Sequence, residues 1–377
     1  MRVQQFHWQP GEPWPAPEPG DLTGAQLLLL FYAAGLEDSP ALAEIRERHP
    51  QALAFGCSTA GEIHDTLVGD DGIVATAVRF EHSTLRHARI ALSATGDSRE
   101  LGRQLATRLP HEGLVHTLVV SDGLLVNGSE LVAGLREALP ANVTSTGGLS
   151  GDGARFVRTT VLCGDQPVAG EVAILGLYGA QLSVGYGSQG GWDPFGPERI
   201  ITRSRGNVLY ELDGQPALEL YKRYLGDHAK DLPSSGLLFP LSLRLSDGSV
   251  LVRTILAVDE AAASLTFAGD VPQGLRARLM MANFDRLVDG AVQAARSSGE
   301  DLAGHPSQLA LLVSCVGRKL VLSQRIEEEL EGVRATLGPG PMLAGFYSYG
   351  EISPFHAHAR CELHNQTMTI TTLAEAA

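Results

Sequence analysis

Three stretches of this chain follow one plan, and this repetition restricts the possible folds more than any other feature. Each stretch is an apolar strand that runs into a glycine-punctuated corner: GCSTAGEI at 56–63, GGLSGDG at 147–153 and GFYSYGEI at 345–352. A strand and a segment with helical features precede each corner, and a further strand follows it. A unit of strand, helix, strand, corner and strand that occurs three times predicts a mixed α/β protein built from related modules.

The predicted elements can be given module by module. The first module has strands at 27–31, 52–55 and 73–80 and a helix that begins at Ser39-Pro40, where serine can cap and proline fits the first turn. The second has strands at 117–120, 143–146, 159–162 and 171–178 and a helix from 127–129 that ends before Pro140. The third has strands at 309–314, 342–346 and 368–373 and a helix with apolar residues at 322, 326, 330, 333 and 337.

The corner glycines have a mechanical explanation. A chain that reverses at a strand end needs a positive φ or close backbone approach, and glycine supplies both without strain. Because equivalent loops of related repeats tend to fall on one side, Gly56, Gly147 and Gly345 are expected to wall one common recess.

The region between the second and third modules is different. It predicts a turn at Asp213-Gly214, a helix from Ala217, strands at 237–245 and 250–258 joined by Asp247-Gly248, a strand at 264–267 and a helix at 287–295. The expected organisation is a Pro-rich arm over 1–20, one domain over 21–212 and another over 213–377.

Composition excludes several classes of function. The chain carries 29 basic and 43 acidic residues, a formal charge of −14, which opposes nucleic acid or anionic membranes as partners. Its four cysteines show no C-x-x-C spacing, the first 20 residues hold no apolar signal region, and the apolar run at 27–36 is too short to span a membrane. These features predict a cytoplasmic protein.

Six stretches in order resemble the FIST sensory proteins over almost the whole chain. They are GCSTAGEI, GGLSGDG, GNVLYELDGQPALELYKRYLG, SCVGR, GFYSYGEI and ELHNQTM. The resemblance implies two packed FIST domains, N-terminal and C-terminal, around a ligand recess, and a bacterial sensor of small molecules such as amino acids. A stand-alone chain of this kind is similar to the nitric-oxide-sensing branch, whose members bind haem b and act on a separate histidine kinase. A cyclic-di-GMP enzyme is the other partner that the resemblance implies.

Haem needs an axial donor, commonly a neutral histidine in an apolar pocket. The sequence favours His364, within ELHNQTM, and then His356, His358 and His64. The alternative is that His364 only hydrogen-bonds the third corner. The run HAHARCELH also holds imidazole and thiolate donors that suit zinc, but Cys361 and His364 would point to opposite faces of an unbroken strand.

The polar residues of the corners are the candidates for direct ligand contact. Glu62, Asp152 and Glu351 could each fix their own turn, or bind the ammonium group of an amino acid, and Arg318 could hold a carboxylate with two hydrogen bonds. The full candidate set is Cys57, Ser58, Thr59, Glu62, Gly147, Gly148, Asp152, Arg318, Tyr347, Tyr349 and Glu351. Trp192, Phe195, Phe346, Tyr347 and Tyr349 could form an aromatic wall, which core packing explains equally well.

Cysteine catalysis is the enzyme-class alternative. Cys57 and Cys315 end apolar strands, with His64 or His364 as a possible base. However, free cysteine usually packs as a small hydrophobe, and the sequence lacks a G-x-S-x-G elbow, a P-loop and an H-E-x-x-H motif. The chain is therefore interpreted as a non-catalytic sensor for haem and nitric oxide, with an amino acid or related metabolite as the alternative ligand.

Overall fold

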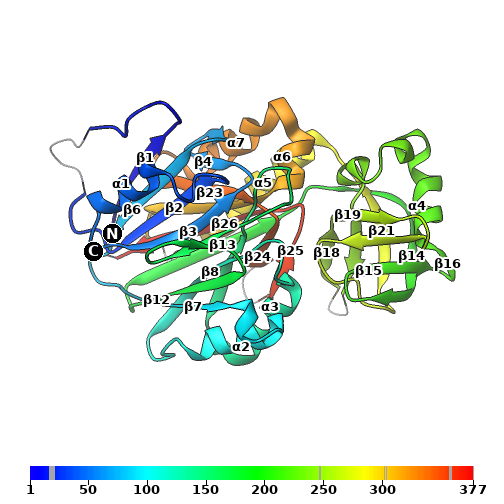
Figure 1. Cartoon of the computed structure of the whole chain (residues 1–377), viewed down its shortest axis with the longest axis horizontal. Coiled ribbons are helices and arrows are strands. Elements are labelled where there is room, and N and C mark those ends of the chain that lie inside the picture. Colours follow the sequence, from blue (N-terminus) through cyan, green and yellow to red (C-terminus); the bar gives the residue numbers. More distant parts are fainter. Residues whose placement is uncertain (17–21, 246–247, 301, 303, 356–358, 377) are drawn as a thin grey trace.

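The computed structural model describes residues 1–376 apart from 17–21, 246–247, 301, 303 and 356–358. Figure 1 shows a large body that contains both chain termini, and a smaller part to its right formed around residues 193–281. Within the described residues the body holds three six-stranded sheets. The predicted mixed α/β architecture of repeated modules is confirmed.

The three sheets of the body are built in the same order. The first is β1 (Arg2–Trp8), β6 (Ile73–Arg79), β2 (Leu27–Ala33), β3 (Leu53–Thr59), β10 (Val161–Cys163) and β11 (Pro167–Val168). The second is β7 (Thr84–Ala91), β12 (Glu171–Tyr178), β8 (Leu114–Ser121), β9 (Thr144–Leu149), β24 (Gly350–Pro354) and β25 (Cys361–His364). The third is β13 (Leu182–Gln189), β26 (Met368–Glu375), β22 (Leu309–Cys315), β23 (Met342–Ser348), β4 (Glu62–His64) and β5 (Leu67–Gly69).

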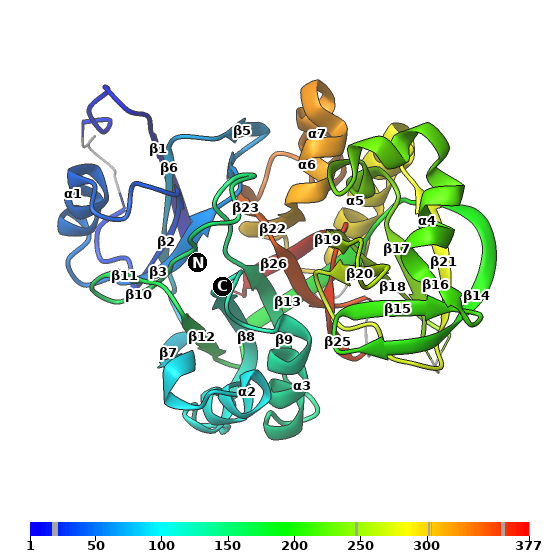
Figure 2. The ribbon, with the colours of Figure 1, turned by 45° about the vertical axis from the view of Figure 1, so that its right-hand side comes forward.

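The strand after each corner leaves its own module and joins the sheet of another. After the first corner, β4 pairs with β23 of the third module; after the third corner, β24 pairs with β9 of the second; and after the second corner, β10 pairs with β3 of the first. The exchange closes in a ring, so each module completes the sheet of a neighbour. Figure 2 shows one of these exchanges, with β10 and β11 beside β3 of the first module. The first and last modules are thereby locked together although they lie at opposite ends of the sequence.

Helices cover the outer faces of these sheets. They are α1 (Pro40–Arg48), α2 (Ser98–Thr107), α3 (Gly128–Ala138), α5 (Phe284–Glu300), α6 (Val316–Leu322) and α7 (Ile326–Leu337), with 3-10 turns η1 (Leu92–Ala94) and η4 (Ser323–Arg325). Side-chain caps start three of them: Ser39 accepts from the Ala41 N–H, Asp97 from the Arg99 N–H and Asn127 from the Ser129 N–H. Between the sheets lies an apolar core in which the rings of Phe31 and Phe346, from the first and third modules, stack at 4.7 Å.

The smaller part is an eight-stranded sheet with one covering α-helix. Its strands are β18 (Val250–Arg253), β17 (Leu241–Arg244), β21 (Arg276–Met281), β14 (Asp193–Arg205), β15 (Val208–Leu212), β20 (Ser264–Phe267) and β19 (Ile255–Asp259), with β16 (Gln215–Pro216) beside β15. The helix is α4 (Ala217–Leu225), followed by 3-10 turns η2 (Gly226–Asp231) and η3 (Ser234–Leu238). This sheet is inserted between β13 and β22 of the third module and has its own apolar core.

The structure differs from the sequence predictions in several elements. Residues 2–8 of the predicted arm form strand β1, because their backbone pairs with β6 along its whole length. The predicted helix from 322 to 337 is broken at Ser323, whose φ of 50° ends α6. Strands β7 and β13 and helix α2 were not predicted, and Asp247 of the predicted hairpin turn lies outside the described residues. The domain division at 212 and 213 stays a prediction.

Among the described residues, every helix is too short or too polar to span a membrane.

Candidate functional site

The three corners meet at one place in the body. The Ala60 N–H donates to the Tyr347 carbonyl at 2.8 Å, and the Tyr347 N–H donates to the Gly61 carbonyl at 2.8 Å, which joins the first corner to the third. The Gly151 N–H donates to the Ser58 carbonyl at 3.0 Å, which joins the second corner to the first. The corners are thus neighbours, as the repeat predicted, although they are almost 300 residues apart in the chain.

The corner glycines themselves line no hollow. Gly56, Gly147 and Gly345 are buried inside their strands, against the carbonyl groups of the adjacent parallel strands. The expected recess walled by all three glycines is therefore filled by packed backbone. Gly148 is equally enclosed, because a β-carbon there would lie 2.7 Å from the side chain of Val313.

An open groove of about 360 Å³ lies beside the first and second corners. Two candidate residues, Thr59 and Asp152, contribute to it. Its full lining is Pro10, Ala33, Ala34, Gly35, Leu36, Thr59, Ala60, Asp70, Asp71, Asp152, Gly153, Ala154 and Arg155. Such a volume suits a small metabolite. Asp70, Asp71 and Arg155 were not singled out from the sequence; the signal that could have found them is the Gly-Asp-Asp-Gly turn at 69–72, which lies between β5 and β6.

Opposite charges face this groove. Asp70 and Asp71 line it from the turn after β5, and Arg155 lines it from the loop after the second corner. The Arg155 guanidinium donates to the carbonyls of Asp152 at 2.8 Å and Ala34 at 3.1 Å, which fixes its position. Asp70 pairs with Lys319, whose ammonium also donates to the Ala60 carbonyl at 2.9 Å. The groove therefore combines anionic and cationic groups.

Glu62 connects this groove to the third sheet. The Thr59 hydroxyl donates to one of its carboxyl oxygens, and the Gly72 N–H donates to the other at 3.3 Å. Burial raises the pKa of Glu62 to about 7, although both hydrogen bonds and nearby Lys319 act in the opposite direction. Glu62 thus fixes its own turn, the first of the two predicted alternatives, and titrates near neutral pH.

Glu351 has the same role in the third corner. Its carboxylate accepts from the Ser348 hydroxyl at 2.8 Å and from the Thr367 N–H at 3.1 Å and hydroxyl at 2.9 Å. Burial raises its pKa to about 8, against the effect of these hydrogen bonds. The pairs Thr59–Glu62 and Ser348–Glu351 have the same spacing in sequence, so the two corners are equivalent in their hydrogen bonds as well.

Asp152 organises the loop that follows the second corner. Its two carboxyl oxygens accept from the successive N–H groups of Phe156, Val157 and Arg158 at 2.8 to 2.9 Å, and from the Tyr349 hydroxyl. These bonds lower the pKa of Asp152 despite its burial. The rings of Phe156 and Tyr349 stack at 4.5 Å, which ties the loop to the third corner.

Arg318 is fully buried and its donors are occupied. It forms hydrogen bonds with Glu329 at 2.7 and 3.1 Å, and it donates to the Leu287 carbonyl at 2.7 Å. Glu329 also accepts from the Tyr347 hydroxyl at 2.8 Å. Neither Arg318 nor Tyr347 reaches the groove, so this network supports the fold where the sequence predicted a ligand clamp.

His364 is enclosed by protein. Its Nε2 lies 2.7 Å from the Ser353 carbonyl, its ring meets the edge of Phe355 at 4.1 Å, and it is 1% exposed. Burial lowers its pKa to about 4, so the imidazole is neutral. A haem needs an open apolar slot beside a free ring nitrogen, and these surroundings do not fit one. His364 instead hydrogen-bonds Ser353 of β24, one residue beyond the third corner.

Several polar atoms beside His364 lack partners in the described part of the chain. They are His364 Nδ1 and both amide atoms of Asn365 and of Gln366, all in side chains that are at most 1% exposed. The turn is held by its backbone, since the Trp192 indole donates to the Gln366 carbonyl at 2.8 Å. Buried amides of this kind are commonly satisfied by ordered water.

The remaining histidine and cysteine predictions can be placed as follows. His356 and His358 lie outside the described residues. His64 stacks on His7 at 5.0 Å, away from Cys57. Cys57 and Cys315 are buried, and burial raises the pKa of both thiols, which keeps them neutral. In the portion of the chain described, no three metal-binding side chains cluster as a metal site would require.

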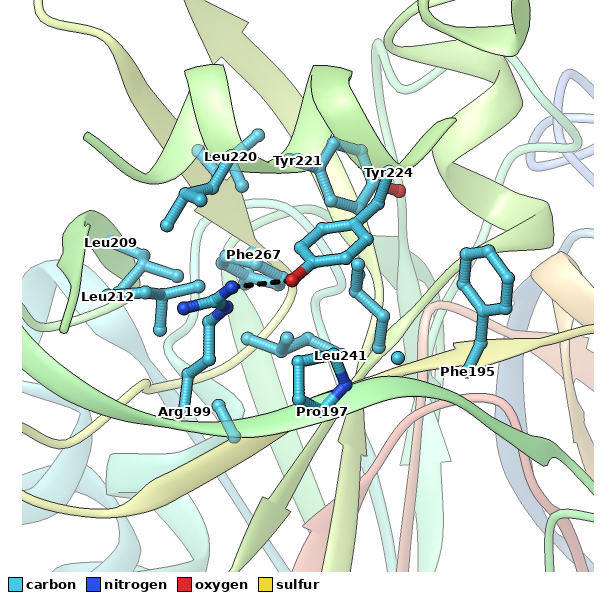
Figure 3. A pocket seen from close by; sticks show the side chains of 14 residues that line it. Phe195, Pro197, Arg199, Leu209, Leu212, Leu220, Tyr221, Tyr224, Leu241 and Phe267 are labelled. Atoms are coloured by element: carbon cyan, nitrogen blue, oxygen red, sulfur yellow. Dashed lines mark hydrogen bonds between the residues drawn. The ribbon is translucent and has the colours of Figure 1, made fainter. Parts of the chain in front are cut away.

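A further cavity lies inside the inserted sheet (Figure 3). Leucine side chains and the rings of Phe195, Tyr221 and Phe267 surround it, and the Arg199 guanidinium donates to the Tyr224 hydroxyl at 2.5 Å. Its free volume of about 20 Å³ has room for one water molecule. It is part of the core of that sheet.

Fold and site together define a class of protein: an interlocked three-module α/β body with an inserted sheet and a polar groove where its corners meet. Comparison with known domains gives the family, because a FIST N domain model matches residues 26–215 and a FIST C domain model matches residues 217–354. The chain belongs to the FIST family of signal-transduction sensory domains.

Individual relatives add little about function. An uncharacterized protein of Mycobacterium tuberculosis strain H37Rv is 27% identical over 253 residues, which are 64% of each chain. An uncharacterized protein of Methanocaldococcus jannaschii is 23% identical over 313 residues, 77% of this chain and 59% of that protein. The chain thus spans less than two thirds of the length of these relatives. A cyanuric acid hydrolase from A. caulinodans aligns over 100% of this chain and 99% of its own, with 9% identity and a TM-score of 0.32, a likeness that carries no argument.

Proposed function

We propose that this protein senses a free amino acid or a closely related zwitterion, bound in the groove beside the first and second corners. The observation that carries the proposal is the presence of both carboxylate and guanidinium groups in the lining of that groove. Asp71 can receive an ammonium group, whereas Asp70 is already paired with Lys319. The guanidinium of Arg155, held by the carbonyls of Asp152 and Ala34, can receive a carboxylate. The volume of about 360 Å³ suits a ligand of this size.

Signal transfer would use the hydrogen bonds beneath the groove. Thr59 lines the groove and donates to Glu62, and Glu62 begins the strand that joins the third sheet. A ligand that holds the 70–71 turn in one position biases this connection, because it binds one arrangement more tightly than the other. The proposed output is a separate histidine kinase or cyclic-di-GMP enzyme in the cytoplasm. The protein itself is proposed to be non-catalytic, since its strand-end thiols are buried and neutral.

The test is a thermal-shift screen of the twenty amino acids, followed by titration calorimetry on each one that raises the melting temperature. Asp71→Asn and Arg155→Lys should weaken binding by about tenfold or more, because each removes a charge or the bidentate geometry. Asp289→Asn is the matched control, since Asp289 is exposed on α5 and lies outside the groove lining. The proposal fails if no amino acid binds, or if Asp71→Asn and Asp289→Asn bind alike.

A visible absorption spectrum distinguishes the haem and nitric oxide hypothesis from the amino-acid proposal. We expect protein expressed with added haem precursor to show no Soret band after gel filtration, because His364 is enclosed and its Nε2 is bonded to Ser353. A stoichiometric Soret band that changes in His364→Ala would instead favour haem as the ligand. A zwitterion would then be the wrong class of ligand.

A further inference from the structure

A second cleft, of about 420 Å³, lies at the opposite end of the first sheet from the corners. The corner groove follows the last residue of β3, Thr59, whereas this cleft is lined by Leu53, where β3 begins. Its full lining is Arg46, His49, Pro50, Ala52, Leu53, Ala54, His87, Arg89, Cys163, Gly164 and Asp165. The two sites share no lining residue, so this cleft is independent of the groove discussed above.

Strand β7 lies at the edge of the second sheet and supplies two polar residues to the cleft. Side chains alternate between the faces of a strand, so Leu85, His87 and Arg89 project from the same face. Leu85 packs against the core between the first and second sheets, beside Leu175 and Leu177 of β12. His87 and Arg89 continue that row, but they open into the cleft over Cys163 and Leu53. Both side chains are exposed on this strand, so a ligand in the cleft can reach them.

Most of the ionisable residues that line the cleft are basic, although the chain has a formal net charge of −14. Arg46, His49, His87 and Arg89 face a single carboxylate of the lining, that of the exposed Asp165. The side chain of Arg46 forms no hydrogen bond or ion pair within the described residues, and the Arg89 guanidinium approaches the Glu171 carboxylate only to 3.7 Å. Both guanidinium groups therefore keep their N–H donors available for a ligand.

A simpler explanation covers part of this arrangement. Arg46 lies in the last turn of α1, where a cation is favoured by the helix dipole. That explanation does not extend to His87 and Arg89, which come from a strand of a different sheet and face the same space.

We propose that this cleft binds a small phosphorylated molecule between Arg46 and Arg89. A phosphoryl group accepts paired hydrogen bonds from two guanidinium forks, and the volume leaves room for the group that carries the phosphate. The thiol of Cys163 stays neutral, because burial raises its pKa to about 11, so it does not repel the anion.

The surroundings of His87 favour the neutral form of its imidazole. Burial lowers the pKa of His87, and neighbouring Arg89 lowers it further. A bound dianion reverses that balance and favours protonated imidazole, so binding takes up a proton and strengthens as the pH falls. The other titratable and charged groups around the ligand are Arg46, His49, Arg89, Asp165 and Glu171.

The experiment is isothermal titration calorimetry with inorganic phosphate and with pyrophosphate, in two buffers of different ionisation enthalpy at pH 6.5 and pH 8. We expect saturable binding that weakens about tenfold in Arg46→Ala and in Arg89→Ala, as loss of a charge-assisted hydrogen bond implies. His87→Gln should retain binding at pH 8 and lose the buffer-dependent heat of proton uptake at pH 6.5. Arg205→Ala, an exposed arginine of the inserted sheet, is the matched control for net charge and should bind like the wild type.

Three results would overturn the proposal. The first is absence of saturable phosphate or pyrophosphate binding up to about 10 mM, the limit of a weak specific site. The second is an equal loss in Arg205→Ala, which would show that only net charge matters. The third is succinate binding as tightly as phosphate, which would assign the cleft to carboxylates. An amino acid that raises the melting temperature equally in Arg46→Ala and wild type would show that the corner groove is intact.

Discussion

The carbonyl oxygen of Leu30 occupies the position that a β-carbon on Gly56 would need, only 1.8 Å from that atom's ideal place. The same relationship joins Val119 to Gly147 at 1.9 Å and Leu312 to Gly345 at 1.8 Å. In each module the two residues are direct partners in the register of a parallel strand pair. The repeated glycine therefore exists because two backbones approach too closely for any side chain. Gly56 and Gly345 do this without a positive φ.

A methyl group at this point should force the parallel strands apart. We expect Gly56→Ala or Gly345→Ala to lower the free energy of unfolding by about 3 kcal/mol or more, because the obstacle is backbone and cannot move aside. Urea denaturation followed by circular dichroism measures the change. Gly299→Ala is the control: that glycine lies in α5 with open space around its β-carbon position, so alanine should be neutral or stabilising by up to about 1 kcal/mol. Equal effects at Gly56 and Gly299 would contradict the close approach.

Replacing only one partner of the buried ion pair between Arg318 and Glu329 should strongly lower the stability of the fold. Arg318→Met leaves the Glu329 carboxylate without its cation in a site of zero exposure, and about 3–5 kcal/mol of stability should be lost. The double variant Arg318→Met with Glu329→Gln should recover part of the loss, because no buried charge then remains. A double-mutant cycle by chemical denaturation measures the coupling, and strictly additive losses would argue against the pair.

Glu62 should make stability fall as the pH rises. Its pKa is about 7 in the folded chain and 4.5 as an ordinary glutamate, so the protonated form is favoured by folding. That contribution is complete below pH 4.5 and is lost as the pH rises through about 7. Relative to the wild type, Glu62→Gln should therefore gain stability between pH 5 and pH 8, by up to about 3 kcal/mol. Thermal unfolding of both proteins across this range is the measurement; a difference that stays constant with pH would show that Glu62 does not titrate there.

The thiols at the strand ends should be inert in the folded protein. Cys57 and Cys315 are at most 2% exposed and their raised pKa values leave almost no thiolate at neutral pH. We expect iodoacetamide at pH 7.5 to leave both unmodified in native protein and to alkylate both in urea, as peptide mass spectrometry would report. Rapid native alkylation of either residue would revive the cysteine-enzyme hypothesis.

The modular plan could be predicted because it rests on local signals. Apolar runs predict the strands and helices, and the caps at Ser39 and Asn127 and the corner glycines mark where these elements begin or end. Each of these signals extends over only a few residues of sequence. Strand β7 was missed because its charged residues, among them Arg86 and Arg89, hide the alternation of a strand. Helix 322–337 was predicted unbroken, since apolar spacing does not reveal the positive φ of Ser323.

The location of the candidate site could be predicted from the sequence, but the roles of several of its residues could not. Thr59 and Asp152 were named from the corners and do line the groove, whereas Arg318 and His364 were named from motifs and lie buried in the fold. A sequence motif records that a residue is needed and does not distinguish a ligand contact from a buried hydrogen bond. Asp71 and Arg155 line the same groove only because the tertiary structure brings loops of two modules together.

Sequence by itself determined the repeated unit, the glycines at which two strands must touch, and the family to which the chain belongs. Only the tertiary structure decided which sheet the strand after each corner joins. These strands leave the sheets of their own modules and pair with strands far away in the chain. Such pairing depends on backbone hydrogen bonds and packing that many sequences could satisfy, so no short motif encodes it. The groove and the basic cleft likewise join side chains that lie far apart in the chain.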